Sequence, residues 1–294
     1  MLCVLHKMGK GSIFIRRFKK GMSSWTIDSV PTMCITLERR PDRWRRFQDQ
    51  SGINGLDLKK FNGVDGKTLD IKNDNRVSLY TKRNIISKSR RSHEELDSAG
   101  GVGCALSHIA VWQWMVDNNR EICVIFEDDA IIPPNFTEQI NTCINESTLL
   151  KDPRKWDLWL LGGTWDDLTQ IPGETKVARV GAFVFFHAYV MTLHGAKRLL
   201  KDVFPIQGHI DLWTSIYNYV HDFRVICCLN LNVKPNSAIK TDIQTEKTCD
   251  ICDVSAGYSK THKLITHMEW NAMAVTVTAV SVGLVGYIVY HKIV

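Results

Sequence analysis

The chain lacks the sequence features of a secreted, disulfide-bonded protein. Its first apolar run, residues 11–15, is far too short for a signal peptide, and basic residues follow it where a cleavage site would lie. The nine cysteines are an odd number, and Cys34, Cys104 and Cys123 lie inside apolar runs, where free cysteine behaves as a small buried hydrophobic residue. The pattern excludes a disulfide framework and favours a reducing compartment.

Internal repeats and the common phosphate-binding fingerprints are also missing. The segment Gly100–His108 has no lysine for a P-loop and the wrong spacing for a dinucleotide-binding motif. It still predicts a phosphate site, because Gly101 and Gly103 open a helix whose free N–H groups and dipole attract anions. Ser107 and His108 lie further along the helix. His108 could bind phosphate, ligate a metal or fill a buried niche.

Length and composition predict one large α/β domain, since 294 residues with 44% hydrophobic and 23% charged content can form a full core. The net charge of +6 is concentrated in three basic clusters, within residues 1–20, 39–46 and 82–91. Such clusters can bind lipid, nucleic acid or nucleotide phosphates. We interpret the first and third as solvated surface and expect no nucleic-acid partner.

The strongest chemical signal is the acidic triplet Glu127-Asp128-Asp129, which follows the apolar run 122–126. Such a run is typical of a strand buried in an α/β sheet, and ligands bind outside the carboxyl ends of these strands. Like charges this close repel unless a cation meets them, and Mg²⁺ or Mn²⁺ prefers oxygen ligands. The alternative is a hydrated acidic loop, which the buried strand disfavours.

Apolar runs alternate with amphipathic segments along the chain, which predicts a largely parallel sheet in a single domain. We expect residues 67–99 to be a mobile excursion, and Asp166 and Asp167 to lie in a loop. Strands are expected over 32–37, 56–61, 122–126, 156–161, 182–186, 189–193 and 224–229, and helices from 41, over 100–118, from 135, over 195–201 and over 211–219.

The ends of the chain differ from the middle in composition. Residues 1–30 are basic and predict a poorly ordered extension, the α/β domain is expected over 31–240, and 241–270 are polar, as in a linker. Residues 271–291 predict a single-pass membrane anchor. Their uncharged stretch, at ~1.5 Å per residue, could cross most of a hydrocarbon core of about 30 Å. The domain would then be membrane-associated and cytosolic; the alternative is a hydrophobic segment docked on the core.

Two further features carry weaker signals. Cys249 and Cys252 precede His262 and His267, but the interval is shorter than in most zinc sites, so we favour no structural zinc there. Asp211 begins a predicted helix, where a carboxylate is often an N-cap. It could also act as a general base if it faces the acidic triplet.

Taken together, these pieces resemble glycosyltransferase family 25, which includes lipooligosaccharide and collagen galactosyltransferases. The resemblance spans about residues 33–215 and follows the family's order. Thr36 departs from it, since the family usually carries Asn there. The matching elements are Ile35–Leu37 with Arg39, Asp42 and Arg43; Phe61–Gly66; Gly101–His108; Phe126–Asp129; Asp157–Gly162; Ala188, Tyr189, Gly195 and Ala196; and Ile210 with Asp211.

The resemblance implies a GT-A-type nucleotide-sugar-binding fold, Mn²⁺ or Mg²⁺, and a UDP-sugar donor, usually UDP-galactose. It also implies inversion at the anomeric carbon. Glu127-x-Asp129 corresponds to the family's D-x-D-like motif, so Glu127 and Asp129 are the expected metal ligands and Asp128 an expected ribose contact. The acceptor would be a hydroxyl of a glycan, a lipid-linked glycan or a protein.

The other candidate residues also take their roles from this resemblance. Arg39 and Arg43 are candidates for the nucleotide pocket. Asp211 is the expected general base, with Asp166 or Asp167 behind it.

Two alternatives remain open at the level of sequence. The chain could be a catalytically inactive, membrane-anchored protein that binds glycans or acts as a scaffold. It could also be a metal-dependent nucleotidyltransferase, which uses paired carboxylates but releases pyrophosphate instead of UDP.

The first prediction concerns the membrane segment. Deleting every residue after Met268 should move the protein from the membrane fraction to the soluble fraction, because the uncharged stretch is removed. Fractionation of cells that express both forms measures this. Full-length protein in the soluble fraction would contradict the anchor.

Overall fold

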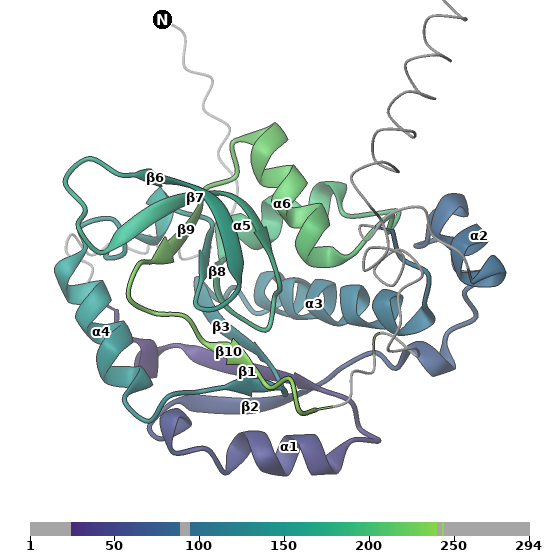
Figure 1. Ribbon diagram of the computed structural model, residues 1–294, viewed down its shortest axis with the longest axis horizontal. Helices are drawn as coiled ribbons and strands as arrows, with labels where there is room; N and C mark the ends of the chain where they lie inside the picture. The colour runs from purple at the N-terminus through teal and green to yellow at the C-terminus, as the bar shows by residue number, and fades with distance from the viewer. Residues whose placement is uncertain (1–24, 89–94, 240–242, 244–294) are drawn as a thin grey trace, which may run out of the picture.

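An eight-stranded sheet forms the centre of the computed structural model, which describes residues 25–88, 95–239 and 243 (Figure 1). Residues 241–270, apart from Ile243, and the predicted anchor 271–291 lie outside the described residues, as do Cys249 and Cys252. Among the described residues, no helix has the length and apolar character needed to cross a membrane. Trp25 lies ahead of the predicted boundary at residue 31 but packs on the domain, because its indole is buried and donates to the Leu150 carbonyl at 2.8 Å.

The sheet is mixed, which corrects the prediction of a largely parallel one. Parallel pairs join β1 to β2, β1 to β3 and β5 to β9, whereas β3–β8, β5–β8, β6–β7 and β7–β9 are antiparallel. A parallel neighbour needs a long crossover, and the connection 171–176 between the neighbouring strands β6 and β7 is too short for one. The order is β2-β1-β3-β8-β5-β9-β7-β6, formed by Asp57–Asn62, Pro31–Thr36, Ile122–Glu127, Ala188–Thr192, Leu158–Leu160, Val225–Cys228, Val177–Val184 and Thr164–Gln170.

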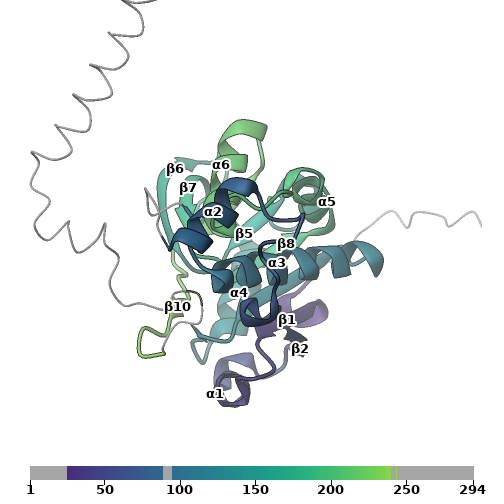
Figure 2. The ribbon, with the colours of Figure 1, turned by 90° about the vertical axis from the view of Figure 1, so that its right-hand side faces the viewer.

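Alternate residues of each central strand face two separate hydrophobic layers. On one face Ile125 and Tyr189 pack with α3 (Ala99–Asp117), α5 (Leu193–Asp202) and α6 (Ile210–His221). On the other face Phe126 packs with α1 (Pro41–Gln48) and α4 (Phe136–Glu146). Figure 1 shows α3 and α4 on opposite sides of the strands, and Figure 2 shows α1 beside β1 and β2, far from α6. The predicted single α/β domain is therefore confirmed.

The expected excursion 67–99 contains a helix, α2 (Leu79–Ser87), as well as the 3-10 turn Gly66–Thr68. Ser78 caps α2 by accepting from the Thr81 N–H at 3.1 Å, and the Thr81 hydroxyl donates to the Ile206 carbonyl at 3.2 Å. The sequence shows no clear helical period here because buried polar side chains, Thr81 and Asn84, make the contacts. A second short sheet pairs β4 (Ala130–Ile131) with β10 (Lys234–Pro235).

A fully buried carboxylate joins the middle strands to the helices. Asp157, just before β5, accepts from the Arg224 side chain at 3.0 and 3.1 Å and from the Arg224 backbone N–H at 2.9 Å. Arg198 and His194 contact the same carboxylate. Burial alone would raise the pKa of Asp157, but the Arg224 and His194 hydrogen bonds outweigh it and the pKa is lowered.

Replacing this carboxylate should destabilise the fold. Asp157→Asn removes the buried negative partner of two half-buried arginines, Arg198 and Arg224, so we expect the free energy of unfolding to fall by about 3 kcal/mol. Because the folded-state pKa is lowered, the wild-type contribution is complete above about pH 4 and is lost as the pH falls below it. Urea unfolding between pH 3 and 7 measures both effects. Asp42→Asn, at an exposed pair with Arg40, is the control and should leave stability nearly unchanged, because solvent screens this pair. Equal effects of the two substitutions would contradict this account.

Candidate active site

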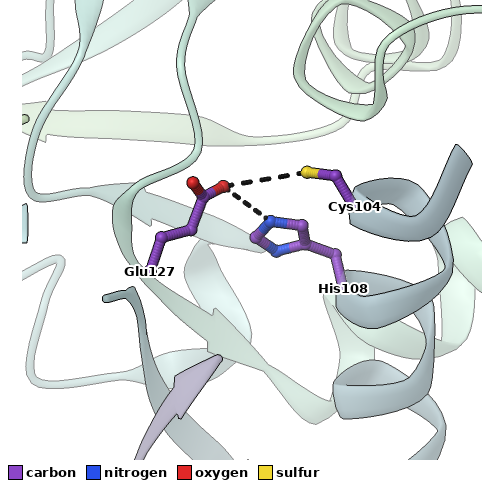
Figure 3. A group of neighbouring side chains, drawn as sticks. All are labelled: Cys104, His108 and Glu127. Carbon is purple, nitrogen blue, oxygen red and sulfur yellow. Dashed lines mark hydrogen bonds and ion pairs between the residues drawn. The ribbon is translucent and has the colours of Figure 1, made fainter. Parts of the chain in front are cut away.

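Helix α3 presents two side chains, Cys104 and His108, to the carboxyl end of β3 (Figure 3). Residues four positions apart share one face of a helix, and both point toward Glu127, the last residue of β3. Ser98 caps α3 by accepting from the Gly101 N–H at 3.1 Å. The helix start therefore sets the direction in which Cys104 and His108 face.

The glycines of this helix permit close packing against the loop after β2. A Cβ on Gly103 would lie 2.5 Å from the Val64 carbonyl oxygen, and one on Gly66 would lie 2.0 Å from the Ala99 carbonyl oxygen. Ser107 completes the contact, because its hydroxyl accepts from the Val64 N–H at 2.8 Å and donates to the Gly103 carbonyl at 2.7 Å. These groups contact protein, so the phosphate-binding role of Gly101, Gly103 and Ser107 stays a prediction.

His108 belongs to a buried hydrogen-bond chain that ends on Glu127. The Trp112 indole donates to the Tyr189 hydroxyl at 3.0 Å, and that hydroxyl lies 2.9 Å from His108 Nδ1. His108 Nε2 lies 3.0 Å from Glu127 Oε1. Since Tyr189 accepts from Trp112, its own O–H is free to donate to Nδ1, and a neutral His108 then carries its proton on Nε2 and donates to Glu127.

The triplet's carboxylates have different surroundings. Burial alone would raise the pKa of Glu127, but the His108 hydrogen bond opposes it and the net shift is downward. Burial and the nearby Glu127 charge raise the pKa of Asp129 to about 7. Asp129 Oδ1 is buried and has no hydrogen-bond partner among the described residues. Asp129 therefore lacks the compensation that Glu127 receives.

Arg43 of α1 offsets part of this negative charge. Its buried guanidinium lies 2.6 Å from Asp128 and 3.3 Å from Asp129. Burial raises the pKa of Asp128, although Arg43 opposes the shift. Arg39 pairs instead with Asp65 at 2.5 Å. Nucleotide contacts by Arg39, Arg43 and Asp128 stay predictions, since each has a protein partner in this structure.

Asp211 lies in the first turn of α6, one position after Ile210, and His209 is the N-cap. The expected capping role is therefore wrong. Its carboxylate accepts instead from the Phe185 N–H at 2.7 Å. Phe185 has a left-handed backbone, φ 78°, which is strained for a bulky residue and which this bond helps to hold.

The Cys104 thiol lies 3.9 Å from Glu127 Oε1. Burial raises the pKa of Cys104, and the charges of Glu127, Asp211 and Asp129 raise it further, in that order. Asp211 is linked to the same strand end through the backbone, because it holds Phe185, two residues before His187, whose carbonyl accepts from the Glu127 N–H.

The second-choice bases have a different environment. Asp166 and Asp167 are exposed on the edge strand β6, not in the loop that the sequence predicted. Asp166 pairs with Ala182 of β7, and Asp167 has a left-handed backbone, φ 54°. Their catalytic role stays a prediction.

Cys104, His187 and Tyr189 are site residues that sequence reasoning did not single out. His187 is buried, its Nε2 donates to the Val233 carbonyl at 2.8 Å, and its own carbonyl accepts from the Glu127 N–H at 2.9 Å. The four-residue spacing of Cys104 and His108 was a usable signal for a shared helix face. No comparable signal gave His187 or Tyr189 a role in the site, because strand pairing places His187 beside Glu127 and Tyr189 beside Ile125, where its hydroxyl reaches His108.

The family model described as "Glycosyltransferase family 25 (LPS biosynthesis protein)" matches residues 30–214, well over half of the chain. The chain belongs to glycosyltransferase family 25. The sequence resemblance is thus confirmed, and the match covers every strand of the sheet except β9.

The family 25 relatives named below are 27–31% identical to the chain over the aligned residues. A "Glycosyltransferase 25 family member" from Anopheles gambiae is 31% identical over 62% of the chain and 32% of the relative. "Procollagen galactosyltransferase 1-A" from Xenopus laevis is 27% identical over 65% and 31%. "Probable inactive glycosyltransferase 25 family member 3" from Bos taurus is 28% identical over 64% and 31%. The chain spans about a third of the length of these relatives.

A solved structure, "Crystal Structure of A197 from STIV", aligns with a TM-score of 0.37 and 10% identity over 72% of the chain and 87% of that structure. This similarity is too low to support any argument on fold or function.

The role of Asp211 can be tested without disturbing the turn that it holds. The Asn side chain of Asp211→Asn can still accept from Phe185, so we expect an intact fold and retained donor binding. Turnover should fall about 10²-fold or more if the carboxylate takes a proton. Steady-state kinetics and donor titration measure the two quantities, with Asp166→Asn as the control. Near-wild-type turnover would leave Asp211 as a hydrogen-bond acceptor only, and lost donor affinity would put it in the sugar pocket.

Proposed function

We propose that this chain is a metal-dependent, inverting hexosyltransferase that moves a sugar from a UDP-sugar to a hydroxyl acceptor. The observation that carries the proposal is the acidic end of β3, where Glu127 ends the strand and the nearby Asp129 Oδ1 is buried with no hydrogen-bond partner among the described residues. Family membership supports glycosyl transfer. Galactose is the favoured sugar, because the relative from Xenopus laevis is named a procollagen galactosyltransferase.

The carboxylates at the end of β3 fit a hard divalent cation. Asp129 has a buried oxygen without a hydrogen-bond partner and a carboxyl pKa raised to about 7, as expected where a positive charge is missing. Glu127 has a second oxygen, Oε2, beside the one that contacts His108. We propose that these two residues hold Mn²⁺ or Mg²⁺. When bound, the cation stabilises negative charge that develops on the departing UDP.

Asp211 is the proposed general base. An inverting displacement needs a carboxylate that takes the acceptor proton as the new bond forms. Asp211 approaches the site from α6, whereas Glu127 and Asp129 approach from β3, so it can act on a different side of the sugar from the leaving group. Asp166 and Asp167 are the second choice.

Donor binding would use groups that now contact protein. Arg39, Arg43, Asp128, Ser107 and His108 would need to exchange or share their present partners to contact a nucleotide. Arg43 is the strongest candidate for a purely electrostatic role, because it already offsets two carboxylates beside the proposed cation. The predicted contacts from Gly101 and Gly103 are part of this proposal.

The acceptor is proposed only as a class, a hydroxyl of a glycan, a lipid-linked glycan or a protein. We place the catalytic domain at residues 31–240, after an amino-terminal extension and before the linker 241–270. The segment 271–291 is proposed as a membrane anchor on sequence grounds. An anchored domain would meet acceptors at the membrane surface.

An inactive, glycan-binding protein is the second candidate. The observation that favours it is that relatives from Bos taurus and Mus musculus are named inactive or probably inactive family members. The present site retains Glu127, Asp129 and Asp211, which an inactive protein does not need together. Release of UDP from a UDP-sugar separates the two, and release of pyrophosphate would indicate a nucleotidyltransferase.

Asp129→Asn should separate activity from stability. Burial and the Glu127 charge disfavour the charged form of Asp129, so the substitution should leave the free energy of unfolding unchanged or raise it. Transfer should fall at least about 10²-fold, since electrophilic help from a metal amounts to several kcal/mol. UDP release with saturating Mn²⁺ and urea unfolding measure the two effects. Full activity in Asp129→Asn, or in wild type with excess EDTA, would contradict metal dependence.

A further inference from the structure

A second set of metal-ligating atoms lies on the α3 side of Glu127, apart from Asp129. The set consists of Cys104 Sγ, His108 Nε2 and a Glu127 carboxylate oxygen, all within 4.8 Å of one another. His108 Nε2 is 3.0 Å and Cys104 Sγ is 3.9 Å from Glu127 Oε1. Figure 3 shows the three side chains pointing toward a common point from two elements.

The donor types differ from those proposed for Mn²⁺ or Mg²⁺. A thiolate, an imidazole and a carboxylate form a borderline-soft set that suits Zn²⁺, and zinc sites with three protein ligands keep water in the fourth position. Tetrahedral zinc with bonds of about 2.0–2.3 Å places its ligand atoms about 3.3–3.6 Å apart. The observed separations of 3.0 and 3.9 Å lie on either side of that range.

The surroundings orient these ligands for a metal. Cys104 and His108 are fixed relative to each other by one helix, and the Glu127 backbone donates to His187 at 2.9 Å. A metal-bound histidine usually gives its other ring nitrogen to a fixed partner, and His108 Nδ1 already lies 2.9 Å from the Tyr189 hydroxyl. If zinc binds His108 Nε2, the imidazole proton must lie on Nδ1. The Tyr189 hydroxyl can then no longer donate to Nδ1 and instead accepts a hydrogen bond from it.

We propose that Cys104, His108 and Glu127 bind Zn²⁺, and that bound zinc inhibits sugar transfer by occupying Glu127. The Zn–S bond forms as the Cys104 thiol releases its proton to solvent. Cys104 is a partly exposed residue, although its thiol is buried enough for desolvation to raise the pKa. Zinc also exceeds Mn²⁺ in affinity for nitrogen and sulfur ligands. The proposal that zinc binds here does not depend on the proposed function, whereas the proposal that zinc inhibits sugar transfer rests on it.

Cobalt spectroscopy tests the binding part without any assay of activity. Co²⁺ is titrated into the full chain that carries Cys249→Ser and Cys252→Ser. These two substitutions remove the Cys-x-x-Cys pair, which could otherwise bind cobalt. We expect a thiolate-to-cobalt charge-transfer band that saturates at one cobalt per chain and disappears when Zn²⁺ is added. Cys104→Ser should abolish the band. Cys143→Ser, a partly buried cysteine on α4, is the matched control and should retain it.

No band in the parent chain, or a band that survives in Cys104→Ser, would overturn the zinc site. Inhibition is measured as UDP release at fixed Mn²⁺ with increasing Zn²⁺. The inhibition of each protein is expressed relative to its own activity without zinc, and Cys104→Ser should need at least about tenfold more zinc for half-inhibition, a difference of about 1.4 kcal/mol in binding. Equal sensitivity of the two proteins would overturn the inhibitory role. If neither protein releases UDP, the proposed function fails, and the cobalt titration still decides the site.

Discussion

The structure depends on how the fold compensates three consecutive carboxylates at the end of a buried strand. Arg43 of α1 pairs with Asp128 from one layer, and His108 of α3 hydrogen-bonds Glu127 from the other. Asp129 receives only the more distant contact from Arg43, and its raised pKa reflects the remaining imbalance. Such an imbalance costs stability and is typical of a site that binds a cation in its working state.

The rest of the fold brings compensating and reacting groups to this strand end. The close contact of Gly103 with Val64, together with the Ser107 hydroxyl, sets the position of α3 and therefore of Cys104 and His108. The antiparallel strand β8 supplies Tyr189 beside β3, and the short turn before it is held by Asp211. The Asp211 carboxylate therefore holds a strained turn and is also the proposed acceptor of a proton.

Much of the architecture could be predicted from sequence, because local patterns determine it. The strand before Glu127, the helix after Pro41 and the long helix from Ala99 follow from apolar runs and capping residues, and the family order pointed to Asp211. The mixed sheet and α2 could not be predicted, since strand direction and buried polar contacts depend on distant partners. The site roles of His187 and Tyr189 were missed for the same reason: strand pairing puts His187 beside Glu127 and Tyr189 beside Ile125, where its hydroxyl reaches His108.

The central claim is that Glu127 and Asp129 hold a divalent cation together with the donor's diphosphate. Electron paramagnetic resonance of Mn²⁺ measures this directly, because the signal of free Mn²⁺ falls as the ion binds. The account predicts that UDP increases Mn²⁺ binding to the wild-type chain, that Asp129→Asn loses this binding, and that Asp166→Asn keeps it. Undiminished Mn²⁺ binding by Asp129→Asn in the presence of UDP would contradict the account.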